Sequence, residues 1–128
     1  MDYLPIFVDL RDRLVVVIGG GVVAARKTEH LLKAHARVRI IAPELEPHLR
    51  IYLEQQRIEH RAVLFTPPEI EGAALVVAAT DDEAVNDAVA RAARERGIWV
   101  NVVDDAARSA FIFPAIVDRS PLIVAVGT

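Results

Sequence analysis

Two hydrophobic patterns alternate along the chain: short continuous apolar runs, and longer segments with apolar residues three or four positions apart. The helical spacing predicts helices over residues 22–34, 45–56 and 83–96. The continuous runs are typical of parallel strands buried on both faces. They cover residues 14–18, 38–42, 74–79 and 98–103, with residues 58–65 as a half-exposed outer strand. Alternating strands and helices predict an α/β fold with helices on both faces of an open, twisted sheet.

The two ends of the chain depart from this alternation. Residues 3–10 are apolar but contain Pro5, which predicts an edge segment and not a central strand. Residues 110–117 and 122–126 form two further predicted strands, and the connection between them is too short for a helical crossover. We therefore expect a Rossmann-type sheet with a parallel centre and an antiparallel C-terminal hairpin at its edge.

Three consecutive glycines stand between the first apolar run and the first helix. They begin the pattern G-x-G-x-x-A, a dinucleotide-binding fingerprint in which a small third residue still permits close packing of helix on strand. Glycines let backbone N–H groups approach a pyrophosphate at the helix N-terminus. The predicted cofactor loop comprises Gly19, Gly20, Gly21, Val22, Val23 and Ala24. Glycine clusters also form ordinary turns, and the motif alone leaves that alternative open.

Acidic residues follow three of the predicted strands. Glu44 stands where NAD-binding folds place a carboxylate for the adenosine ribose, and a charge at the start of the next helix is an equal alternative. Thr80, Asp81 or Asp82, after the fourth strand, is expected to cap the helix that follows. Asp104 and Asp105 follow the fifth strand without a clear helix behind them, so one of them is expected to enter the crevice. A neighbouring charge and partial burial would raise the pKa of that carboxyl and make it a better base.

Composition narrows the classes of function. The 128 residues are 53% hydrophobic, which suits one globular domain over residues 1–128, and no apolar run is long enough to span a membrane. A net charge of −3 without a basic patch argues against nucleic acid. The chain has no cysteine, and its histidines lack metal-ligand spacing, so we expect no metal site. These features predict a cytoplasmic protein that binds neither membrane nor nucleic acid.

Several motifs also recur in the order and spacing of a known family. They are Leu4-Pro5-Ile6-Phe7, the glycine loop with Arg26-Lys27, Ala78-Ala79-Thr80-Asp81-Asp82, Asn101-Val102-Val103-Asp104, and Phe113-Pro114 with Asp118-Arg119-Ser120-Pro121-Leu122. Over the whole chain the sequence resembles the N-terminal domain of siroheme synthases and the stand-alone precorrin-2 dehydrogenases. The resemblance implies NAD-dependent oxidation of the tetrapyrrole precorrin-2 to sirohydrochlorin. In many members it also implies insertion of ferrous iron to make siroheme.

The resemblance implies roles for individual residues. Asp104 is implied to be the catalytic base. The residues implied to line the adenosine and pyrophosphate half of NAD are Val22, Val23, Pro43 and Glu44, and those implied near the nicotinamide are Thr80 and Val103. A polycarboxylate substrate needs cationic partners, and Arg108 and Arg119 lie on suitable loops, with a solvated surface position as the alternative for each.

Family members continue past the last strand into a helical segment that builds a homodimer and covers the substrate, whereas this sequence stops at Thr128. The resemblance implies a homodimer in the full-length protein and leaves open whether this chain alone has activity. A rival from another class is a module that binds NAD or a nucleotide and reports to a partner without chemistry. Glu44 would repel the 2′-phosphate of NADP, and no arginine lies in residues 42–45, so NAD is the expected dinucleotide.

Overall fold

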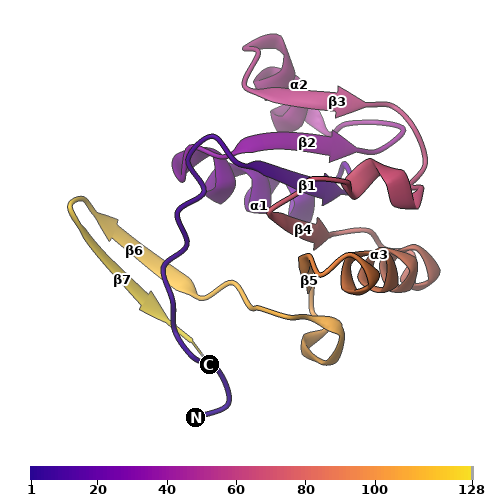
Figure 1. Cartoon of the computed structure of the whole chain (residues 1–128). Helices are drawn as coiled ribbons and strands as arrows, with labels where there is room; N and C mark the ends of the chain where they lie inside the picture. Colours follow the sequence, from indigo (N-terminus) through magenta and orange to yellow (C-terminus); the bar gives the residue numbers. More distant parts are fainter. Residues whose placement is uncertain (128) are drawn as a thin grey trace.

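A computed structural model describes residues 1–127 (Figure 1). Its elements are, in chain order, β1 (Leu14–Ile18), α1 (Val22–Lys33), β2 (Arg37–Ile41), α2 (Pro47–Glu54), β3 (Ile58–Arg61), the short 3₁₀ helix η1 (Pro67–Ile70), β4 (Leu75–Ala78), α3 (Glu83–Glu95), β5 (Trp99–Val102), the 3₁₀ helix η2 (Ala106–Arg108), β6 (Ala115–Arg119) and β7 (Leu122–Val126). The predicted alternation of buried strands and helices is confirmed in type and order. Thr128, the last residue of the predicted domain, lies outside the described residues.

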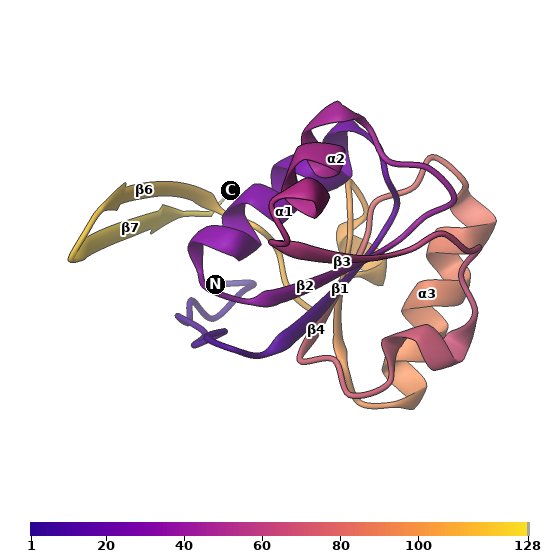
Figure 2. The same cartoon turned by 90° about the horizontal axis from the view of Figure 1, so that it is seen from above.

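The main sheet is parallel throughout and has the strand order β3-β2-β1-β4-β5. The chain builds outward from β1 through β2 to β3, then returns to the other side of β1 with β4 and β5. Helices α1 and α2 cover one face of the sheet and α3 covers the other (Figure 2). The predicted α/β class is therefore confirmed, and the strand order reverses between β1 and β4, where such folds bind ligands.

The side chains of β1 are buried on both faces of the sheet, which explains why this strand occupies its centre. Val15 and Val17 join the apolar cluster under α1 and α2, whereas Val16 and Ile18 join the cluster under α3. All four side chains are at most 2% exposed. Full burial of one such side chain stabilises a fold by about 1.5–3 kcal/mol, so the apolar run can be accommodated only between two covered faces.

Left-handed residues follow each of the three α-helices, with Gln56 in this position after α2. His35, with a φ of 63°, follows α1, and Gly97, with a φ of 66°, follows α3. Histidine tolerates this conformation at some cost, whereas glycine adopts it freely. Both turns direct the chain into the next parallel strand.

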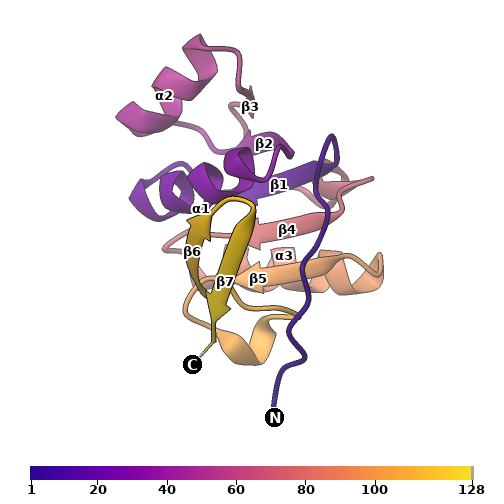
Figure 3. The same cartoon turned by 90° about the vertical axis from the view of Figure 1, so that its left-hand side faces the viewer.

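The predicted position of the C-terminal hairpin is wrong. Strands β6 and β7 pair antiparallel as a separate two-stranded sheet. This hairpin projects from the main sheet on the side where the parallel strands begin, away from their carboxyl ends (Figures 1 and 3). The outer edge of β5 is occupied by the segment between β5 and β6, in which the Ala110 N–H donates to the Val100 oxygen at 2.7 Å. A hairpin cannot add to an edge that is already paired, and β6 accordingly starts at Ala115, not at residue 110.

Three further boundaries differ from expectation. Residues 3–10 form no strand, α2 starts at Pro47 and not at residue 45, and β3 ends at Arg61 and not at residue 65. Helix α2 starts late because the side chain of Glu46 caps it, and an N-cap residue is itself not helical. None of the helices in residues 1–127 is long and apolar enough to cross a membrane.

Candidate functional site

The loops after β1, β4 and β5 meet at the carboxyl edge of the sheet, where open α/β folds bind their ligands. A cleft of about 220 Å³ opens there between the loops that follow β4 and β5. Its walls are formed by Thr80, Asp81, Glu83, Asn86, Val102, Val103, Asp104, Asp105 and Arg108. The residues that follow β4 and β5 in sequence are thus brought together in space, beside the glycine loop of the adjacent strand.

The three glycines of the loop differ in how much room the structure leaves for a side chain. Gly19 has a φ of 128°, and a side chain there would collide with the carbonyl of Ala79. A Cβ at Gly20 would collide with the carbonyl oxygen of Glu44 and lie 2.9 Å from the Ala42 Cβ. A Cβ at Gly21, in contrast, would meet no atom within 4 Å. The first two glycines permit the loops to pack, and the third leaves open space in front of α1.

The N-terminus of α1 offers unpaired donors to that space. Gly21 is its N-cap residue, no side chain caps it, and its first turn holds no acidic residue. The backbone bonds of the helix begin with the Ala25 N–H, which donates to the Gly21 oxygen at 3.0 Å. An α-helix leaves its first N–H groups without intrahelical acceptors, and these groups carry the positive end of the helix dipole. Val22 and Val23 are exposed, so a pyrophosphate can reach these groups, and the loop fits a dinucleotide.

The loop after β2 is joined to the glycine loop. The Glu46 N–H donates to the Gly20 oxygen at 2.8 Å, and the backbone of Glu44 packs against Gly20. Pro43 and Glu44 are exposed beside the glycines, so the predicted adenosine-binding residues do lie next to the loop.

The helix-start alternative for Glu44 is wrong. Glu46, not Glu44, caps α2, because its Oε1 accepts from the Leu49 N–H at 2.7 Å. Burial raises the pKa of Glu46, but hydrogen bonds from His48 and from the Leu49 N–H outweigh it and hold the pKa below its usual value. With α2 capped by another residue, the exposed Glu44 carboxylate has no role in starting that helix.

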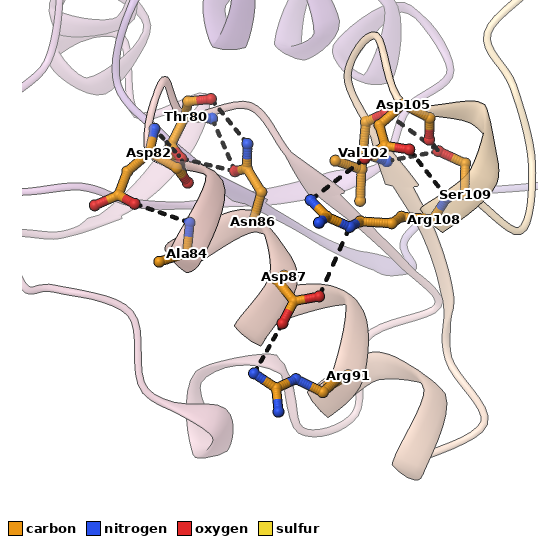
Figure 4. Close-up of polar contacts among 10 residues, drawn as sticks. All are labelled: Thr80, Asp82, Ala84, Asn86, Asp87, Arg91, Val102, Asp105, Arg108 and Ser109. Atoms are coloured by element: carbon orange, nitrogen blue, oxygen red, sulfur yellow. Dashed lines mark hydrogen bonds and ion pairs between the residues drawn. The ribbon is translucent and has the colours of Figure 1, made fainter.

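The loop after β4 is held together by its own side chains (Figure 4). Thr80 Oγ1 donates to Asn86 Oδ1 at 2.7 Å, and Asn86 Nδ2 donates back to the Thr80 oxygen at 3.0 Å. Asp82 Oδ1 accepts from the Ala84 N–H at 2.9 Å, which confirms the predicted acidic cap of this helix. Thr80 is therefore a fixed, half-buried part of the cleft wall, and Asp82 serves α3.

The two aspartates after β5 have different surroundings. Asp105 Oδ1 accepts from the Arg108 N–H at 3.2 Å and caps η2, a helix that the sequence does not predict. Asp104 has a φ of 60° and is exposed, so the expected partial burial is wrong. A left-handed non-glycine residue costs about 1–3 kcal/mol and such residues cluster at functional sites, although aspartate tolerates this conformation better than most. Asp104 is thus a carboxylate on the cleft that caps no helix, as is Asp81 after β4, and only Asp104 has a left-handed backbone among the carboxylates that line this cleft.

The two candidate arginines lie in different places. Arg108 lines the cleft, with its Nε 3.7 Å from Asp87 Oδ1 and its Nη1 3.4 Å from Asp105 Oδ2 (Figure 4). Arg119 lies at the turn of the β6–β7 hairpin, and this hairpin lies remote from the carboxyl ends of the parallel strands (Figure 1). Val103, by contrast, donates its N–H to the Ala78 oxygen at 3.0 Å and so lies beside the end of β4. The structure brings the predicted site residues together, with Arg119 as the exception.

Lys27, on α1, is a candidate that the sequence does not indicate. Its Nζ lies 4.4 Å from the centroid of the Phe113 ring, within the range of a cation–π contact. Burial lowers the pKa of Lys27, and the negative charge of Asp104 partly opposes that shift. The available signal was a cation at an inward-facing helical position, where an apolar residue is the usual choice.

A parallel sheet with an open glycine loop at its switch point defines a dinucleotide-binding domain of the Rossmann type. The chain belongs to the family described as putative NAD(P)-binding, which matches residues 6–115. The predicted class of cofactor is thereby confirmed.

Relatives confirm the predicted resemblance as well. Over 100% of its length the chain is 53% identical to a siroheme synthase from Methylobacillus flagellatus and 52% identical to siroheme synthase 2 from Aeromonas hydrophila. It spans 27% of the length of each of these relatives. The solved structure of SirC, precorrin-2 dehydrogenase, matches with a TM-score of 0.84 and 24% identity, over 98% of this chain and 62% of that chain. That structure supports the fold assigned here.

Proposed function

We propose that this chain is the NAD-dependent dehydrogenase domain that oxidises precorrin-2 to sirohydrochlorin. Its similarity to siroheme synthases and to the structure of a precorrin-2 dehydrogenase supports the substrate. The observation that carries the proposal is Asp104, an exposed left-handed carboxylate on the cleft, at the same edge of the sheet as the uncapped N-terminus of α1. A dinucleotide-binding fold needs the open helix N-terminus to hold its cofactor. A dehydrogenase needs the carboxylate to take a proton.

The residues of the chain divide the work of this reaction. NAD, when bound, supplies the acceptor for the hydride that leaves the substrate. The first N–H groups of α1 bind the pyrophosphate, and the Glu44 carboxylate accepts hydrogen bonds from the ribose hydroxyls. Thr80 and Val103 form the wall for the nicotinamide end. The substrate loses a proton together with the hydride, and the Asp104 carboxylate accepts that proton and releases it to solvent, since its side chain is exposed.

The choice of NAD over NADP follows from Glu44. Its exposed carboxylate lies beside the glycine loop, where it would repel a 2′-phosphate on the ribose. No arginine in residues 42–45 is present to neutralise such a phosphate. Ferrochelatase activity with ferrous iron and a homodimer in longer family members stay predictions from the resemblance.

Asp104→Asn tests the proposal most sharply. Asparagine also tolerates a left-handed backbone, so the variant removes the base and keeps the conformation, which alanine would strain. We expect turnover of precorrin-2 with NAD, followed by the absorbance of sirohydrochlorin, to fall by about a hundredfold or more, the usual contribution of a general base. NAD affinity should stay unchanged in a calorimetric titration.

Asp12→Asn is the matched control, because Asp12 is also an exposed aspartate with a φ of 60° and lies before β1, at the other end of the sheet. It should leave turnover unchanged. Full turnover in Asp104→Asn would contradict the assignment of the base. A chain that binds NAD but ignores the tetrapyrrole would instead support the rival reading, a nucleotide-sensing module.

A further inference from the structure

We propose that Lys27 binds a carboxylate of the tetrapyrrole substrate beside Asp104. The inference rests on the proposed function, because it names a substrate contact in the same site. It assigns that contact to α1, the helix otherwise assigned only to the cofactor.

The position of Lys27 in α1 directs its side chain toward the site. The residue lies about one and a half turns after the first residue of the helix, and side chains of a helix lean toward its N-terminal end. Its half-buried stem brings Nζ to 4.4 Å from the centroid of the Phe113 ring. The ammonium group is therefore held between α1 and the segment that follows β5.

The aromatic partner of Lys27 is itself fixed. Asn101 Nδ2, on β5, donates to the Phe111 oxygen at 3.0 Å. The rings of Phe111 and Phe113 pack against each other with centroids 5.6 Å apart. This segment is attached to β5, the strand that leads to Asp104, and the charge of Asp104 acts on the ammonium group.

Among the described residues Lys27 has no anionic partner within 4.0 Å, unlike Arg108 and Lys33. Arg108 is shared between Asp87 and Asp105, and Lys33, on the same helix, pairs with Glu29 at 3.3 Å. In the part of the chain that the structure describes, no carboxylate oxygen lies within 4.0 Å of the Lys27 nitrogen. A partly desolvated cation without a counter-ion is unfavourable unless a ligand supplies one.

The electrostatics of Lys27 agree with an anionic ligand. Burial lowers its pKa, and the charge of Asp104 acts in the opposite direction. A substrate carboxylate arriving at this point would favour the charged amine further and would form a charge-assisted hydrogen bond with it. The pyrophosphate has its own donors at the start of α1, which leaves Lys27 for the substrate.

The test compares Lys27→Met with Lys33→Met. Each removes one lysine of α1, and methionine keeps an unbranched apolar stem that can still pack against Phe113. Sirohydrochlorin is titrated into the chain without NAD, and binding is followed by the change in its absorbance. Loss of a charge-assisted hydrogen bond is expected to weaken binding by about tenfold or more in Lys27→Met. Lys33→Met should match the wild type, and Lys27→Arg should recover most of the affinity.

NAD titration and thermal unfolding of the same variants separate the explanations. We expect NAD affinity and unfolding temperature to change little in Lys27→Met. Equal sirohydrochlorin affinity in Lys27→Met and the wild type would overturn the inference and leave the proposed function intact. A loss of NAD affinity in Lys27→Met would also overturn it, because Lys27 would then serve the cofactor. A wild-type chain that binds NAD but no sirohydrochlorin would overturn the proposed function and the inference together.

Discussion

Helices α1 and α3 begin at adjacent loops of one sheet edge, and they begin in different ways. Asp82 caps α3 with its side chain, and Glu83 adds a negative charge to the first turn. Helix α1 starts at Gly21 with no side-chain cap and no acidic residue in its first turn. One helix therefore satisfies its N-terminal donors from its own sequence, and the other leaves them for a ligand.

The difference shows that the start of α1 lacks a stabilising interaction that the start of α3 has. An N-cap side chain is worth about 1 kcal/mol, and α1 does without one. It stays in place through its apolar face, on which Ala24 and Leu31 are at most 2% exposed against the sheet. Packing thus holds the helix from one side, while its end stays available to a phosphate.

Gly21→Asp should have the largest effect, because it gives α1 the same start as α3. The new side chain has room, and an aspartate cap should stabilise the helix slightly. Two unit charges about 4 Å apart near a protein surface repel by about 4 kcal/mol, so NAD affinity should fall by roughly a hundredfold or more. Calorimetric titration measures this loss. Gly21→Ser, which adds a cap without a charge, is the control and should lose less NAD affinity. An unchanged NAD affinity in Gly21→Asp would show that the pyrophosphate does not bind at the first turn of α1.

Gly20→Ala should have the next largest effect, and on folding. The added Cβ would collide with the Glu44 oxygen and lie 2.9 Å from the Ala42 Cβ. Overpacking of this kind costs about 1–3 kcal/mol, measured as a lower free energy of unfolding in urea. In Gly21→Ala, one residue further along, the added Cβ has no neighbour within 4 Å, so this variant should lose less stability, limited to the poorer N-cap that alanine provides. Equal stability of the two variants would show that the loops do not pack as described.

Asp82→Ala should act on α3 alone. Loss of the bonds to the Ala84 and Val85 N–H groups should lower the free energy of unfolding by about 1 kcal/mol. NAD affinity should stay within a factor of about two, since a cap that serves its own helix binds no ligand. A large fall in NAD affinity together with a small fall in stability would break the distinction between the two helix starts.

The sequence predicted those parts of the fold and site that depend on local pattern. A run such as that of β1 is buried on both faces wherever it is placed, so its apolar residues identify a central strand. Gly19 and Gly20 are required because a side chain on either would collide with the backbone of a neighbouring loop. Asp104 lies two residues after the end of β5, and the carboxyl end of a parallel strand fixes the edge of the sheet on which it lies.

The features that were missed depend on contacts between distant residues. The sequence predicts a hairpin at the sheet edge because nothing in residues 110–117 shows that Ala110 pairs with β5. The contact of Lys27 with Phe113 joins α1 to the segment after β5, and no local pattern encodes it. Arg119 was grouped with the site through its place in the sequence, whereas the separate β6–β7 sheet carries it away.

The smallest expected effect concerns acid, and it extends the comparison to α2, which is also capped by its own carboxylate. The folded pKa of Glu46 lies below its usual value of 4.5, although burial opposes this, because His48 and the Leu49 N–H bind the charged form. The unfolded state therefore binds the proton more readily, and this stabilisation is complete above the unfolded value and lost as pH falls through the folded pKa. Glu46→Gln should show a shallower loss of unfolding free energy in urea between about pH 7 and about pH 3 than the wild type. Glu54→Gln, which changes an exposed acid at the other end of α2, is the control, and an equally shallow slope in that variant would mean that the cap is not the group that titrates.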